Sequence, residues 1–190
     1  MGDVEKIVAG AWEELPRADG ALLKEIRADQ WEVCHEGLGS RADAMLRSAG
    51  CGKLDRSEAA RADEAVGLWI PQLRIVLLNA AHPSLVGLDR ASLDLNVKCV
   101  AWHEWGHALS IDRAGDDDVA RGPEYLALMP PEIADAVRKS GYRRREFTHE
   151  IVAEIYSILV LRRRLGKAGR PEWLNAKIYE LVRRVAGWNQ

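Results

Sequence analysis

A chain of 190 residues, of which 47% are apolar, is long enough to fold as one domain around a sizeable core. Its 27 basic and 29 acidic residues leave a formal net charge of -2, so the composition lacks the basic excess that would favour a nucleic acid as partner. The sequence shows neither a membrane-length apolar run nor a signal-peptide pattern. We therefore expect a single-domain cytoplasmic protein, residues 1–190, that binds neither nucleic acid nor membranes.

The N-terminal part, residues 1–95, is predicted to combine helices with a small sheet. Alternation of large apolar and polar side chains predicts a half-buried strand over 31–36. The strongest strand prediction is 73–78, a run of aliphatic residues that follows Pro71. Apolar spacings of three and four, together with helix-start and helix-stop residues, predict helices over 3–14, 21–28, 40–46 and from Ser57 onward.

The C-terminal half is predicted to be helical around a polar insertion. A helix over 96–111 is apolar nearly all round, which predicts that it is buried in the middle of the fold. Residues 112–147 are predicted to form a surface loop or lid that contains a short helix over 131–139. C-terminal helices over 147–190 complete the chain, one ending near Leu165 and the last beginning at Pro171.

Three cysteines, Cys34, Cys51 and Cys99, are widely spaced and form no Cys-x-x-Cys pair. We expect all three to be reduced thiols that serve as small core residues. A thiolate ligand from Cys34, next to His35, is a weaker alternative that would apply to a latent metal site.

The most informative segment is His103-Glu104-Trp105-Gly106-His107. Because residues four apart lie on one face of a helix, the two histidines can offer imidazole nitrogens to one metal ion, with Glu104 about 100° round the same turn. Two imidazoles beside a carboxylate are typical of a Zn²⁺ site that has a general base next to it.

A catalytic zinc site needs a third protein ligand and one open position. The three-histidine metzincin pattern would require glycine and histidine where this chain has Ser110 and Arg113. A carboxylate is the better candidate, since Glu150 and Glu154 lie one helical turn apart among apolar residues, where an acid is costly unless paired with a charge or a metal. Either of the two acids can be the ligand, and His149 is a weaker alternative.

The pentapeptide and the segment Glu150-Ile-Val-Ala-Glu154 together resemble the gluzincin family of zinc metallopeptidases, in particular its small one-domain members, the minigluzincins. The resemblance implies an α+β, zincin-like fold, mostly helical, with a small sheet whose edge strand precedes the motif helix. It also implies that Glu150 is the third zinc ligand and that Glu154 accepts the other ring N–H of a ligand histidine. The 42 residues between His107 and Glu150 exceed the spacing of the thermolysin-like members.

The same resemblance implies peptide-bond hydrolysis by zinc-activated water, with Glu104 as the general base. A peptide or protein substrate would pair with the free edge of the predicted strand at Asn79 and Ala80. Tyr142 is the first candidate for stabilising the oxyanion, with Tyr125 and Arg143–Arg145 as alternatives.

Two other functions are compatible with all of the motif residues. One is a metal-binding domain that is catalytically silent or latent and acts in regulation or interaction. The other is a regulatory protein that binds nucleic acid through Arg143–Arg145 or Arg162–Arg164, although charges next to acids or helix ends are more often simply solvated.

Overall fold

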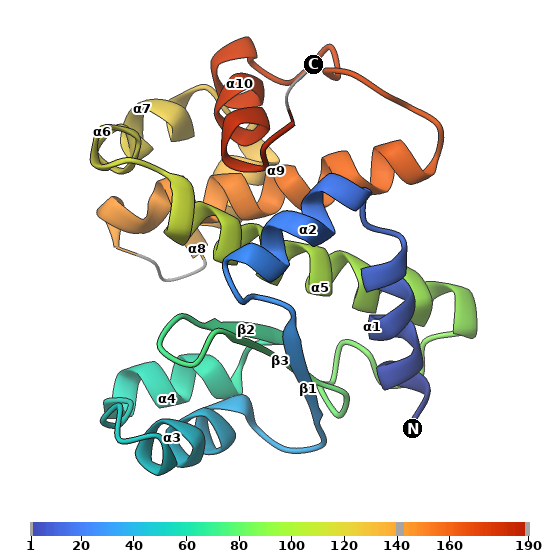
Figure 1. Cartoon of the computed structure of the whole chain (residues 1–190), viewed down its shortest axis with the longest axis vertical. Coiled ribbons are helices and arrows are strands. Elements are labelled where there is room, and N and C mark those ends of the chain that lie inside the picture. The colour runs from blue at the N-terminus through green and yellow to red at the C-terminus, as the bar shows by residue number, and fades with distance from the viewer. Residues whose placement is uncertain (1, 140–142, 189–190) are drawn as a thin grey trace.

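The computed structural model describes residues 2–139 and 143–188 of the chain. Three strands and a larger number of helices alternate in the N-terminal half, and helices alone make up the C-terminal half (Figure 1). None of the helices formed by the described residues combines the length and apolar character that a membrane span requires. The elements are α1 (Asp3–Glu13), α2 (Arg17–Glu25), β1 (Gln30–Cys34), α3 (Leu38–Ser48), α4 (Arg56–Asp63), β2 (Gly67–Ile70), β3 (Ile75–Asn79), α5 (Arg90–Arg113), α6 (Asp116–Ala120), α7 (Gly122–Ala127), α8 (Pro131–Lys139), the 3-10 helix η1 (Arg144–Glu146), α9 (Phe147–Arg164) and α10 (Ala176–Val185).

The three strands form one mixed sheet in the order β1-β3-β2, so the α+β class is confirmed. Strand β3 is parallel to β1 and antiparallel to β2. It is buried on both faces, because Val76 and Leu78 contact the main core while Leu77 belongs to a second core with α3. Burial on both faces explains why β3 reads as a continuous aliphatic run and not as an alternating one.

One part of the expected sheet is wrong. The strand that precedes the motif helix is central and not at an edge, and the edge strand nearest that helix is β2. Pro71 ends β2 at the start of a tight turn that places Arg74 at a φ of 52° and returns the chain antiparallel along β3. The proline therefore separates two strands of a hairpin, whereas the sequence predicted only the second of them.

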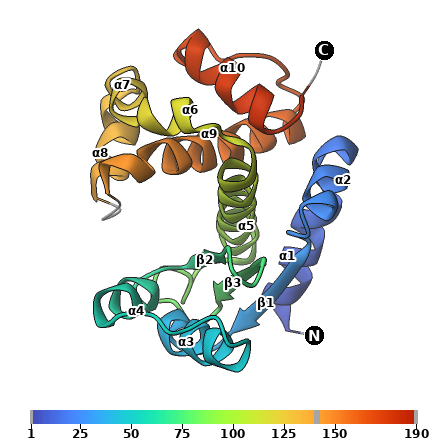
Figure 2. The same cartoon turned by 60° about the vertical axis from the view of Figure 1, so that its left-hand side comes forward.

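Helix α5 runs through the middle of the molecule, with the sheet on one side and α9 on another (Figures 1 and 2). The predicted burial of this helix is confirmed, since both Trp102 and Trp105 are fully buried. Trp102 Nε1 donates to the Ala11 carbonyl at 3.0 Å, and Trp105 packs edge-on against Trp12 of α1. The helix begins earlier than expected because the Asp89 side chain caps the first N–H groups.

The region 112–147 is not the predicted surface loop. It folds into α6, α7, α8 and η1, and α7 packs on α9 through buried Tyr125 and Leu126. Acidic residues in the first turn of α6 and a proline in the first turn of α7 stabilise these helix starts, although both also occur in loops. The helix predicted over 131–139 is confirmed, whereas the last helix begins at Ala176 and not at Pro171.

Candidate metal centre

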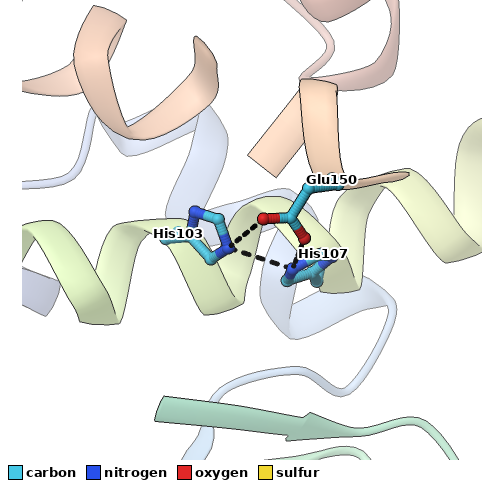
Figure 3. Close-up of side chains that lie close together, drawn as sticks. All are labelled: His103, His107 and Glu150. Atoms are coloured by element: carbon cyan, nitrogen blue, oxygen red, sulfur yellow. Dashed lines mark hydrogen bonds and ion pairs between the residues drawn. The ribbon is translucent and has the colours of Figure 1, made fainter. Parts of the chain in front are cut away.

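Three side chains of the predicted site converge between α5 and α9 (Figure 3). His103 Nε2 lies 3.1 Å from His107 Nε2 and 3.7 Å from Glu150 Oε1, and His107 Nε2 lies 3.3 Å from Glu150 Oε2. Ligand atoms on a tetrahedral zinc ion with bonds of about 2.0 Å are about 3.3 Å apart. These separations match the edges of a metal-coordination tetrahedron, so the three residues can hold a metal ion.

The convergence depends on close contact between the two antiparallel helices. Gly106 lies between the histidines, and a Cβ atom at this position would be 2.7 Å from the Ala153 Cα atom of α9. A glycine opposite an alanine therefore lets the helix backbones approach closely enough for a glutamate to reach the two imidazoles. Nothing in the sequence distinguishes Ala153, whose role appears only once the helices are paired.

The structure distinguishes between the alternatives for the third ligand. Glu154 Oε2 lies 3.4 Å from His103 Nδ1, the ring nitrogen that faces away from the other two ligand atoms. His149 Nδ1 instead lies 2.9 Å from Ser110 Oγ, and His149 is outside the ligand cluster found among the described residues. Glu150 thus groups with the two imidazole nitrogens that can hold a metal ion, whereas Glu154 lies at the outer nitrogen of His103, where it can orient the ring.

The electrostatics of the cluster favour a bound cation. Burial disfavours charge on His103, but the hydrogen bond with Glu154 and the charges of the surrounding acids outweigh it and raise its pKa to about 9. Burial is the largest single effect on Glu150 and raises its pKa, but the hydrogen bond with His107 and the charges of both histidines together lower the pKa below its ordinary value. Carboxylates thus surround two buried imidazoles, an arrangement in which a divalent ion replaces a proton at low cost.

Glu104 lies beside the ligand cluster on the side of the sheet and is 6% exposed. Burial raises its pKa, while the two histidines and a hydrogen bond from the Trp69 backbone N–H oppose the rise. Gly67 allows this arrangement, because a Cβ atom there would be 2.9 Å from Glu104 Oε1. Gly67 and Trp69 were not among the predicted site residues, because the strand expected beside the motif helix was 73–78 and β2 was not predicted.

A cavity of about 410 Å³ opens next to His103, Glu104 and Glu154. It extends away from the ligand cluster toward the N-terminal end of α5, between β2 and α9. An open space beside the metal position is what a substrate-binding site requires.

The other predicted site residues whose side chains the structure describes do not reach this centre. The Asn79 N–H donates to the Val66 carbonyl and the Ala80 N–H to the Cys34 carbonyl, so neither lies on a free strand edge as expected. Tyr125 is buried, with its hydroxyl 3.3 Å from Asp118 Oδ1.

Tyr142 lies outside the described residues. Arg143 and Arg144 are exposed. Cys34 is buried in β1, and neither it nor His35 belongs to the ligand cluster.

No protein-family model matches the chain, and neither does any curated protein or solved structure. The resemblance to gluzincins therefore depends on the motif residues alone.

Proposed function

We propose that this protein is a Zn²⁺-dependent metallopeptidase. The observation that carries the proposal is the tetrahedral spacing of His103 Nε2, His107 Nε2 and the Glu150 carboxylate, with the Glu104 carboxylate buried beside them. Two imidazoles and one carboxylate form a ligand set used by catalytic zinc sites, whereas oxygen-only sites suit magnesium or calcium. Zinc bound there would supply a Lewis acid and lower the pKa of bound water to about 7.

Glu104 would act as the general base. Its carboxylate is buried next to the ligand cluster, where it can accept a proton from metal-bound water and return it. The Trp69 N–H holds the carboxylate at the side of the cleft, and the two histidines lie within charge–charge range. Glu104 would take a proton from the attacking water and deliver it to the leaving amine.

The edge of β2 would bind an extended peptide in place of the predicted edge at Asn79. Because Asn79 and Val66 form a hydrogen-bonded pair, the alternation of an antiparallel ladder turns the N–H and C=O groups of Gly67 away from β3. Gly67 also lines the cavity beside His103. A substrate strand paired there would lie along α5 with its backbone next to the ligand cluster.

The test combines metal content with peptide cleavage for the zinc-loaded wild type and three variants. His103→Ala should lose zinc, whereas Glu104→Gln should keep zinc and lose turnover by at least about a hundredfold. Glu172→Gln, a surface change of the same charge, is the control for neutralising an acid and should match the wild type. Wild-type protein that remains metal-free without chelators would overturn the proposal.

The same experiment distinguishes the alternative of a metal-binding but catalytically silent or latent domain. In that case wild type and Glu104→Gln would bind zinc equally and neither would cleave any peptide of a diverse library.

A further inference from the structure

The cavity beside the ligand cluster has an aliphatic wall. Val66 before β2, Val100 on α5 and Ile158 with Leu161 on α9 line it from three directions. These side chains offer contact to hydrocarbon but no hydrogen bond. A ligand group that enters this space must therefore be largely aliphatic where it meets the wall.

Several polar groups that line the same cavity have lone pairs that can accept a hydrogen bond from a ligand. Asn96 Nδ2 donates one of its two hydrogens to the Ser92 carbonyl within α5, and the amide oxygen accepts no hydrogen bond from the described residues. The Ser157 hydroxyl likewise donates to the Glu154 carbonyl within α9. The lining residues therefore bring several acceptors to the cavity: the Asn96 amide oxygen, the Ser157 lone pairs and the Glu154 carboxylate.

Glu154 adds a negative charge to this surface. Its side chain is 35% exposed, and only its Oε2 atom is close to His103, at 3.4 Å. A carboxylate can accept on both oxygens, so Oε1 remains available to a second donor. His103 also lines the cavity and faces Glu154, but as a metal ligand it is a neutral imidazole, and the described lining residues include neither a lysine nor an arginine.

From the aliphatic wall and the open acceptors we infer that this cavity binds a basic side chain of the substrate, lysine or arginine, next to the bond that is cleaved. The hydrocarbon stem would lie along Val100 and Ile158, and the cationic nitrogen would donate to Glu154 and to neighbouring acceptors. An α-amino group would meet the same acceptors but lacks the stem that fills the aliphatic part. The inference rests on the proposed peptidase site, because it assumes that the substrate reaches the ligand cluster.

The test uses binding and not turnover. Three dipeptide hydroxamates that differ only in one side chain, lysine, norleucine or glutamate, are titrated calorimetrically into the zinc-loaded protein. The hydroxamate anchors each compound on the metal, so the differences in affinity among the three compounds show how well the cavity accepts each side chain. We expect the lysine compound to bind about tenfold to a hundredfold tighter than the norleucine compound, and the glutamate compound to bind weakest.

A pair of variants separates the cavity from general electrostatics. Asn96 is an exposed residue at the cavity, so Asn96→Lys adds a cation there with little risk to folding. Leu95→Lys adds the same charge at the neighbouring exposed position, which does not line the cavity. Asn96→Lys should reduce the preference for lysine over norleucine to near one, while Leu95→Lys should keep the wild-type preference.

Each outcome bears on the inference separately from the proposed activity. Equal or tighter binding of the norleucine compound overturns it, as does an equal loss of preference in both lysine variants. Preferential binding of the lysine compound in a protein that cleaves no peptide would support the inference and overturn the peptidase proposal. If no hydroxamate binds the zinc-loaded protein, both are wrong.

Discussion

Two buried acidic side chains lie at different faces of helix α9, and they differ in their hydrogen-bond partners. On one, Asp19 of α2 is fully buried and accepts from Tyr156 Oη at 2.9 Å and from Trp188 Nε1 at 2.6 Å. On the other, Glu150 Oε2 is buried without a hydrogen-bond partner and lies 3.3 Å from His107 Nε2. In both cases, burying an ionisable carboxyl group in the protein core costs free energy.

The difference separates a structural acid from a ligand. Each oxygen of Asp19 has a donor from the chain itself, so the group links α2, α9 and the C-terminal segment in the folded protein. Glu150 is left short of a donor at the point where two imidazole nitrogens also converge. A buried acceptor short of donors, next to other metal-ligating atoms, supports the proposal that an ion completes the set.

Replacing the two acids in turn should therefore give opposite results. Glu150→Ala should weaken zinc binding by at least about a hundredfold, since it removes one of three protein ligands. In metal-free protein the same change should lower the free energy of unfolding measured in urea by less than Asp19→Ala does, because burial of Glu150 offsets most of its attraction to the two histidines. Asp19→Ala should keep zinc binding but lower the free energy of unfolding by about 2 to 4 kcal/mol, because it leaves two buried donors unpaired. Equal destabilisation of the metal-free variants would contradict the comparison.

Glu104 is a third buried acid and lies between these two cases, because it has one backbone donor and neighbours the ligands. Gly67→Ala would place a Cβ atom 2.9 Å from Glu104 Oε1 and 2.6 Å from Val100 Cγ1. We expect peptide cleavage to fall by about a hundredfold from misplacement of the base, with zinc content unchanged.

Gly20→Ala is the matched control for the Gly67 variant. A Cβ atom at Gly20 meets nothing within 4 Å, and the residue lies inside α2. The control should keep full activity and gain up to about 1 kcal/mol of stability. Unchanged activity in Gly67→Ala would show that the position of Glu104 does not depend on β2.

Glu154 tests the supporting position behind the ligands. Glu154→Gln keeps the shape but weakens the acceptor for His103 Nδ1, so zinc affinity should fall by about tenfold to a hundredfold, less than for Glu150→Ala. Competition with a chromophoric chelator measures both variants on one scale. If Glu154→Gln lost more affinity than Glu150→Ala, the two glutamates would have to exchange roles.

The site was more predictable than its surroundings. The spacing of His103 and His107 places two ligands on one helical face whatever the rest of the fold does. The choice between Glu150 and Glu154 needed the pairing of α9 with α5, because each acid alone satisfies the sequence pattern. Gly106 and Ala153 set that pairing through a backbone contact that no single segment reveals.

The sequence-based predictions of the fold were wrong where the structure depends on how elements pair with one another. Burial of β3 on both faces was readable from its aliphatic run, but its central place in the sheet depends on the turn at Pro71. Likewise, the acids of α6 are equally common in loops, and this segment is fixed by contacts such as the hydrogen bond from Thr148 Oγ1 to the Asp118 carbonyl. Local propensity says little about such contacts.

The smallest expected effect concerns the pH dependence of the structural acid. Burial raises the pKa of Asp19, and the hydrogen bonds from Trp188 and Tyr156 offset the rise only in part. A raised pKa in the folded state means that this carboxyl contributes most to stability below its unfolded pKa of about 3.9, and that the contribution is lost as pH rises through the folded pKa. The stability difference between wild type and Asp19→Asn, measured by urea unfolding of metal-free protein, should therefore shrink from about pH 4 toward neutral pH, by about 1.4 kcal/mol per unit of pKa elevation. Because the asparagine cannot ionise while the metal site is the same in both proteins, a difference that grew with pH would mean that the two donors hold Asp19 as a stabilised carboxylate, with its pKa lowered.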